Sequence, residues 1–224
     1  MIDYNKPGAT QTAVPPYVDT DAEISYGALL AQTMMLVAAA IGVLTLGSVI
    51  GADYSRGTAL MFSIAGFGML IAQSFVEKLR TGLIGTTWLF ALALAIGLGL
   101  GPVLNYYLSA NPDVVAEAAG MTAVTVLGAA SIGTLTSRDL AKWMKPLSLI
   151  VFVFALGSWV LLAFGSGGSP IISMVIGIVS ALLIVVDFNY LRRHATEKDV
   201  IWIATGIFVS IINIFLSLLN ILDD

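Results

Sequence analysis

Residues 182–193 read LLIVVDFNYLRR: an aliphatic run ends in a carboxylate, and two arginines follow close behind. Asp187 stands directly after the five apolar residues 182–186. In hydrocarbon, a carboxylate costs several kcal/mol unless it is paired, protonated or hydrated. If this stretch lies in a membrane, Asp187 is therefore a candidate functional residue. The rest of the sequence decides whether the stretch lies in a membrane.

The composition places the chain in a membrane. Of its 224 residues, 58% are hydrophobic and 11% are charged, and the mean hydropathy is +0.95. A water-soluble domain carries roughly a quarter charged residues. This chain has too few charges to cover a surface in water, so the sequence predicts an integral membrane protein surrounded by the lipid bilayer.

Several classes of function do not fit the residues. The net charge of −4 leaves no basic patch for nucleic acid. With no cysteine and a single histidine, His194, neither a thiolate site nor a multi-histidine metal site can form. No nucleophile–base pair, metal triad or HExxH-like motif is visible, so we expect no enzyme and no cofactor. The last span has no interior lysine for a retinal Schiff base, and the glycine run AIGLGLGP (95–102) is no phosphate loop because no lysine follows it.

Seven apolar segments are long enough to cross a bilayer, which takes about 20 helical residues. Turn-forming or charged stretches such as SANPD (109–113) and GSGGSP (165–170) separate them. No stretch alternates polar and apolar residues with period two, so a β-barrel is excluded. We predict an all-α seven-transmembrane-helix bundle, with a polar tail at 1–26, one domain at 27–222, and spans at about 27–50, 58–76, 82–107, 113–135, 146–165, 169–191 and 199–222.

The distribution of positive charge predicts the orientation. Residues 1–26 hold three prolines, four acids and one lysine before the first long apolar run, a pattern unlike that of a cleaved leader. Cytoplasmic loops carry an excess of lysine and arginine. We therefore expect a cytoplasmic N-terminus and an external C-terminus, because nine basic residues fall on the N-terminal side and only Arg56 falls opposite: Lys6, Lys78, Arg80, Arg138, Lys142, Lys145, Arg192, Arg193 and Lys198.

Small residues predict how the helices pack. Helices in lipid associate through close contact of small side chains. In span six such a face runs on, by steps of three and four residues, through Ile184 to Asp187, so the carboxylate should point into the bundle. The small or polar faces are Ser173, Gly177 and Ser180 in span six, Gly206, Ser210, Asn213 and Ser217 in span seven, and Gly120, Thr125, Gly128 and Ser131 in span four.

Asp187 has two interpretations at this point. It either handles ions or protons inside the bundle, or it lies at the cytoplasmic rim and pairs with Arg192 or Arg193.

Two further polar residues are weaker pathway candidates. Glu117, one turn into span four, is equally explained as a hydrated acid, and Asn105, beside Tyr106 and Tyr107, as an interfacial cap. His194, among charges in a loop, is expected to be solvated.

From about residue 26 to the end, the chain resembles the Bax inhibitor-1 family, also called transmembrane Bax inhibitor motif proteins, and its prokaryotic members in particular. One part of the resemblance is a GP-containing third span, an NP turn and a small-residue span: GLGLGPVLNYYLSANPDVVAEAAGMTAVTVLGAASIGTLTSRDL (97–140). The more specific part is the C-terminal helix pair, VVDFNYLRRHATEKDVIWIATGIFVSIINIFLSLLN (185–220). Asp187 matches the first aspartate of the family, with Phe188 and Asn189 in place of Thr-Gln.

The sequence departs from the family at the second aspartate, where it has Ser210. Family members with both acids are understood as pH-sensitive calcium leak channels in which the two carboxylates share a proton. The resemblance therefore implies a calcium-permeable pathway here. A lone Asp187 would titrate by itself and not as a coupled pair.

Two functions from different classes follow. The first is a cation leak channel, with calcium as the expected permeant ion, Asp187 as pathway or gate carboxylate and weak, transient calcium ligand, and Ser210 and Asn213 facing it. In this hypothesis Arg192 and Arg193 latch Asp187. The second is a non-conducting membrane protein that acts in stress control by binding protein partners, which the sequence does not identify. Either would be a multi-pass protein, in a prokaryote of the inner (plasma) membrane.

Overall fold

The computed structural model describes residues 25–163 and 169–223, and within them it is helical and contains seven helices long and apolar enough to span a membrane. Most of the polar tail, most of the GSGGSP turn and Asp224 lie outside these residues. Where the structure describes them, the ends of the helices lie within three residues of the predicted span ends; the predicted end of the fifth span, residue 165, lies outside the described residues. The helices are α1 (Tyr26–Ile50), α2 (Arg56–Phe75), α3 (Gly82–Ala110), α4 (Pro112–Leu135), α5 (Met144–Ala163), α6 (Pro170–Arg193) and α7 (Val200–Leu222), with short 3₁₀ turns η1 (Glu77–Arg80), η2 (Ala141–Trp143) and η3 (Glu197–Asp199).

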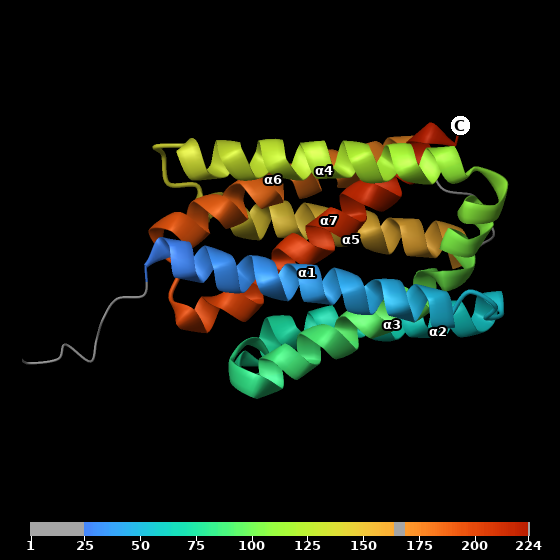
Figure 1. Cartoon of the computed structure of the whole chain (residues 1–224), viewed down its shortest axis with the longest axis horizontal. Coiled ribbons are helices and arrows are strands. Elements are labelled where there is room, and N and C mark those ends of the chain that lie inside the picture. Colours follow the sequence, from blue (N-terminus) through green and yellow to red (C-terminus); the bar gives the residue numbers. More distant parts are fainter. Residues whose placement is uncertain (1–24, 164–168, 224) are drawn as a thin grey trace, which may run out of the picture.

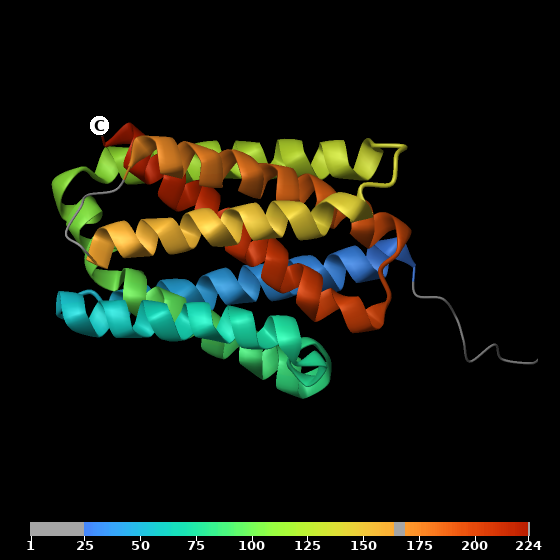
Figure 2. The ribbon, with the colours of Figure 1, turned by 180° about the vertical axis from the view of Figure 1, so that it is seen from behind.

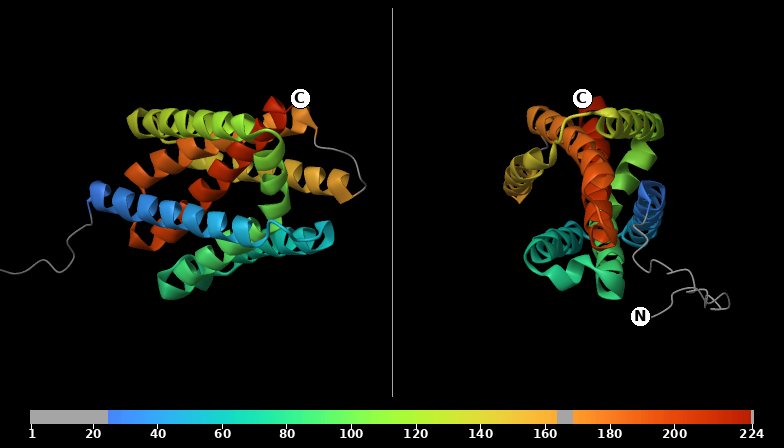
Figure 3. Two further views of the ribbon diagram at one scale, coloured as in Figure 1. Left: turned by 45° about the vertical axis from the view of Figure 1, so that its right-hand side comes forward. Right: turned by 90° about the vertical axis from the view of Figure 1, so that its left-hand side faces the viewer.

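Helix α7 forms the centre of the bundle. It is the most buried of the seven spans and packs against α6, α1 and α4 (Figures 1 and 3). Helix α5 lies at the periphery, is the least buried span and packs chiefly on α6. The helix that follows Asp187 in the chain is therefore the one around which the others are arranged.

Alternate glycines in AIGLGLGP wedge α3 between α1 and α2. A side chain at Gly97 or Gly101 would collide with the backbone of α1, and one at Gly99 would collide with α2. Such close approach is open only to residues without a Cβ. The neighbours of these glycines are Leu44, Gly47 and Ser48 in α1, Gly51 directly after α1, and Ala59 and Ser63 in α2.

The antiparallel pair α6 and α7 packs through the small-residue faces that the sequence predicts. A Cβ placed at Gly177 would lie 3.1 Å from the Cβ of Ser217, and Ser173 Oγ donates to Asn220 Oδ1 over 3.0 Å. At the other end of the pair, Gly206 lies against Asp187.

The predicted face of α4 is wrong. A Cβ added at Gly120 or Gly128 would have no atom of another helix within 4 Å, so both glycines face outward. Gly133 instead packs against Val185 and Phe188 of α6. The residues of α4 that are buried are Ala118, Thr122, Ala129 and Gly133.

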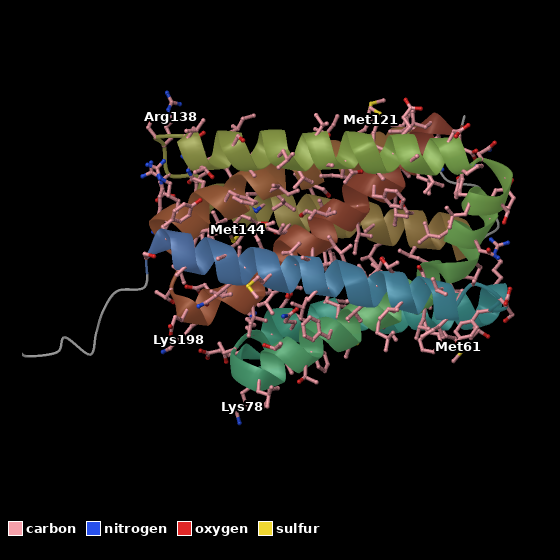
Figure 4. All side chains as sticks on the ribbon, in the orientation of Figure 1. Met61, Lys78, Met121, Arg138, Met144 and Lys198 are labelled. Carbon is pink, nitrogen blue, oxygen red and sulfur yellow. The ribbon has the colours of Figure 1, made fainter. Side chains whose placement is uncertain are left out.

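The described basic residues other than Arg56 gather at one end of the bundle. Lys78, Arg138 and Lys198 lie at the end where α1 begins (Figure 4), whereas the C-terminus lies at the other end (Figure 1). Arg56 begins α2 at the end opposite the start of α1. The asymmetry that the sequence suggests is therefore present in three dimensions.

Candidate functional site

A cavity of about 450 Å³ lies beside α7, between α2, α5 and α6. Viewed from the face that carries α5, α7 crosses behind the space between α5 and α2 (Figure 2). Most of the lining is aliphatic or aromatic, and most of its polar side chains come from α2 and α7. The polar side chains of the lining are Ser63, Gln73, Ser74, Ser148, Asp187, Thr205, Ser210 and Asn213.

Asp187 lies at this cavity and is only 5% exposed. Its Oδ2 would be 3.2 Å from a Cβ placed at Gly206, so the absence of a side chain there makes room for the carboxylate. Within residues 25–163 and 169–223 its carboxylate has no hydrogen-bond or ion-pair partner. A buried acid without a partner is costly to ionise unless water or a cation enters the cavity.

Ser210 and Asn213 line the same cavity as Asp187. The structure therefore brings together the three residues of the predicted pathway. Gly206, one turn before Ser210, is the α7 residue that directly abuts the carboxylate. Helical spacing predicts the shared face, but it does not tell which of its members lies opposite Asp187.

Gln73 and Thr205 also line the cavity, and sequence reasoning misses both. Gln73 is fully buried in α2, and its Nε2 donates to Leu79 O over 3.1 Å and to Thr205 Oγ1 over 3.2 Å. Its Oε1 is buried without a hydrogen-bond partner in the described part of the chain. An amide inside an apolar span is the signal that could have drawn attention to Gln73.

The latch expected of Arg192 and Arg193 is not formed. Arg192 donates to Thr134 O, and Arg193 donates to the carbonyl oxygens of Thr136 and Ser137. Both guanidinium groups thus satisfy carbonyls at the C-terminus of α4, where helical carbonyls lack partners. This corrects both the latch and the pairing of Asp187 at the rim.

Asn189 connects α6 to the chain between α4 and α5. It is fully buried; its Oδ1 accepts from Leu140 N over 2.9 Å, and its Nδ2 donates to the carbonyl oxygens of Gly133, Thr136 and Arg138. These bonds fix the segment that leads into α5 against the helix that carries Asp187. The sequence places Asn189 where the family has a glutamine but gives no hint of this role.

The weaker candidates lie away from the cavity. Asn105 and Glu117 are both exposed and are not part of the lining.

The sequence suggests that His194 is simply solvated, but in the structure it also contacts an acid. Its Nε2 lies 2.8 Å from Asp139 Oδ2. The backbone N–H of Ala141, followed by His194, holds the pKa of Asp139 below its usual value.

A resident metal site is not evident in the part of the chain that the structure describes, since no group of three or more His, Cys, Asp or Glu residues comes together there. A cation in the cavity would find one carboxylate together with hydroxyl and amide oxygens. Such a set suits a weakly held, oxygen-preferring cation better than a tightly bound one.

A set of small and polar residues, called here the polar seam, lies between α6 and α7 on the side of Asp187 toward the C-terminal end: Ser173, Gly177, Ser180, Ser217 and Asn220. Ser180 is fully buried, and its hydroxyl has no hydrogen-bond partner among the described residues. Ser217 lies against Gly177 one turn further on, and Ser173 and Asn220 follow. The seam lies between the depth of Asp187 and the end of the bundle opposite the basic residues.

Comparison with known proteins gives a consistent result. The family model described as "Inhibitor of apoptosis-promoting Bax1" matches residues 25–224. An uncharacterized membrane protein of Vibrio cholerae is 28% identical over 196 residues, which cover 85% of this chain and 84% of the relative. The modulator of FtsH protease YccA of Escherichia coli is 29% identical over 167 residues, 73% of this chain and 74% of the relative. Protein lifeguard 4 of Mus musculus is 24% identical over 173 residues, 75% of this chain and 69% of the relative.

Proposed function

Because this chain belongs to the Bax inhibitor-1 family, we propose that it is a passive cation leak whose pathway passes the cavity at Asp187. Calcium is the proposed permeant ion, and neither a cofactor nor catalysis is required. The supporting observation is the Asp187 carboxylate, which is buried, unpartnered within the described chain and directed to a cavity.

A cation that enters the cavity would replace the missing partner of this carboxylate. Calcium prefers six to eight oxygen ligands. Asp187, the Gln73 Oε1 atom and the oxygens of Thr205, Ser210 and Asn213 supply only some of these, so water would have to complete the shell. Weak binding of this kind suits conduction, because an ion must also leave.

The polar seam gives the pathway a direction. From Asp187 the ion or its water would pass Ser180 and Ser217 toward the end of the bundle that carries Asn220. The opposite end of the bundle carries the excess of positive charge, so we propose that it lies in the cytoplasm and that the C-terminus lies outside. A relative named an inner membrane protein supports the inner membrane as the location in a bacterial cell.

Ion flux in liposomes tests the leak. Purified protein would be reconstituted, and calcium, sodium and proton entry would be compared with that in protein-free liposomes. We expect protein-dependent calcium entry that exceeds sodium entry. Liposomes with inserted, folded protein that admit none of the three ions would refute the proposal.

Modulation of a membrane protease is a second candidate function. It is favoured by the similarity to the relative that is named a modulator of FtsH protease. Degradation of a substrate by purified FtsH protease in liposomes, with and without this chain, tests it. A change in the degradation rate together with absent ion flux would favour this function over the leak.

A further inference from the structure

The cavity at Asp187 also opens onto the outer surface of the bundle between α2 and α5. Several of its lining residues are themselves exposed, among them Phe75, which is 84% exposed, and Phe152. Across the opening, α2 and α5 are bridged by the stacked rings of Phe67 and Phe152, whose centroids are 5.1 Å apart. Since α2 and α5 are spans, the medium outside this opening is the hydrocarbon of the bilayer.

Positive charge borders the basic end of this opening. The Arg80 guanidinium lies 4.4 Å from the centre of the Trp202 ring and donates to the carbonyl oxygens of Gln73 and Ser74. Trp202, Gln73 and Ser74 all line the cavity, so Arg80 is at its rim.

Lysines extend this charge on both sides of the opening. On α5, the exposed Lys145 directly follows the lining residue Met144. Lys142 is exposed in η2, and Lys78 is exposed in η1 beside Glu77. Arg80 and Lys145 therefore adjoin residues of the lining, and Lys78 and Lys142 lie close to them in the chain.

We infer that this cavity binds one anionic phospholipid, with an acyl chain between α2 and α5 and the headgroup against Arg80, Lys142 and Lys145. The cavity volume of about 450 Å³ and its largely apolar walls are those of a small-ligand site. Basic groups between spans are suited to anionic headgroups. This inference does not require that the protein conduct ions.

Quenching of Trp202 by brominated lipid tests the inference. In a variant with Trp88, Trp143 and Trp159 replaced by Phe, Trp202 is the one remaining tryptophan. This protein would be placed in zwitterionic liposomes that contain a few mole per cent of a lipid with brominated acyl chains. Random contact with bulk lipid quenches Trp202 fluorescence in proportion to the mole fraction of brominated lipid. A brominated lipid bound in the cavity quenches it by much more than that mole fraction. We expect excess quenching by the anionic brominated lipid, with a preference of roughly fivefold or more over the zwitterionic one.

A matched pair of single variants and one double variant make the result specific. Ala155→Phe fills the cavity from α5, and Val153→Phe, at a position 55% exposed, adds the same ring on the bilayer side. The first should abolish the excess quenching and the second should leave it. Lys142→Gln with Lys145→Gln should remove the preference for the anionic lipid.

Three outcomes would overturn the inference. The first is quenching in proportion to mole fraction for both lipids. The second is equal excess quenching by the anionic and zwitterionic lipids. The third is the same excess quenching in the Ala155→Phe and Val153→Phe proteins. None of these readouts depends on ion flux, so the lipid site and the leak can fail separately.

Discussion

Asp187 and Asn189, two residues apart on α6, are both buried polar side chains with opposite surroundings. The Asn189 amide makes four hydrogen bonds to the chain between α4 and α5. The Asp187 carboxylate makes none within the described residues and lies at a cavity. A buried polar group with all its hydrogen bonds stabilises one arrangement of the chain. A buried polar group without partners destabilises the fold, and a bound ligand can remove that destabilisation. This contrast is why we assign a structural role to Asn189 and propose ion handling for Asp187.

Replacement of Asn189 by alanine should destabilise the protein. The change removes the Asn189 partner of the part-buried Leu140 N–H and of the Gly133 and Arg138 carbonyls, whereas Thr136 O keeps its bond from Arg193. Each buried group left unsatisfied costs about 1–3 kcal/mol. We expect Asn189→Ala to lower the free energy of unfolding by at least about 2 kcal/mol, measured by thermal unfolding in detergent. Asn105→Ala, at an exposed position, is the matched control and should unfold like the parent. Equal unfolding temperatures for the two variants would contradict the assigned role.

Restoring the second acid of the family should add a titration to the flux. Ser210 lines the cavity with Asp187, so Ser210→Asp places two carboxylates in one site. Two such groups resist double ionisation. The pH profile of calcium flux should therefore acquire a step that the parent chain lacks. A folded Ser210→Asp protein with the parental profile would show that the two positions do not interact.

At the scale of the helices, length and composition predict more than packing. The spans are predictable because about 20 apolar residues are needed to cross hydrocarbon, whatever their neighbours. The shared faces of α6 and α7 also follow from spacing, since small residues and Asp187 recur on one side. The outward position of Gly120 and Gly128 in α4 could not be predicted, because a small residue can be tolerated on a lipid face as well as required at an interface. The hydrogen bonds of Arg192 and Arg193 depend on where the end of α4 lies relative to α6, and the sequence of α6 does not predict that position.

The alternate glycines of α3 should be intolerant of a methyl group. A Cβ at Gly101 would meet the backbone of Gly51 and Ser48 in α1, so Gly101→Ala must push the two helices apart. Overpacking of this kind costs about 1–3 kcal/mol. Gly128→Ala is the matched control: no neighbouring atom lies within 4 Å, and helix propensity favours alanine. Thermal unfolding should show a loss for Gly101→Ala and no loss for Gly128→Ala; the reverse order would refute the wedge.

At the scale of the whole molecule, the bundle has one basic end and a central helix. The described lysines and arginines other than Arg56 lie in turns or helix ends at the end where α1 begins (Figure 4). Loops rich in such residues stay in the cytoplasm. The charge asymmetry is visible in the sequence because the spans alternate in direction. The cavity cannot be read from the sequence, because it is lined by residues of five helices whose relative positions only the fold defines.

Reporter fusions test the orientation. A reporter placed after Asp224 should be external, and one inserted in the 194–198 loop should be cytoplasmic. Both reporters on the same side would mean that α7 does not cross the membrane.

The proposed leak requires the charge of Asp187, and calcium flux through Asp187→Asn protein in liposomes tests that requirement. The amide is nearly isosteric and cheaper to bury, so the fold should be kept, as the unfolding temperature would show. Attraction between unit charges about 4 Å apart is about 4 kcal/mol at an effective dielectric constant of about 20, so its loss should lower calcium flux by roughly tenfold or more. Any pH dependence of the flux should also flatten. Glu117→Gln, which neutralises an exposed acid outside the cavity, should conduct like the parent. A folded Asp187→Asn protein with parental calcium flux would contradict the account.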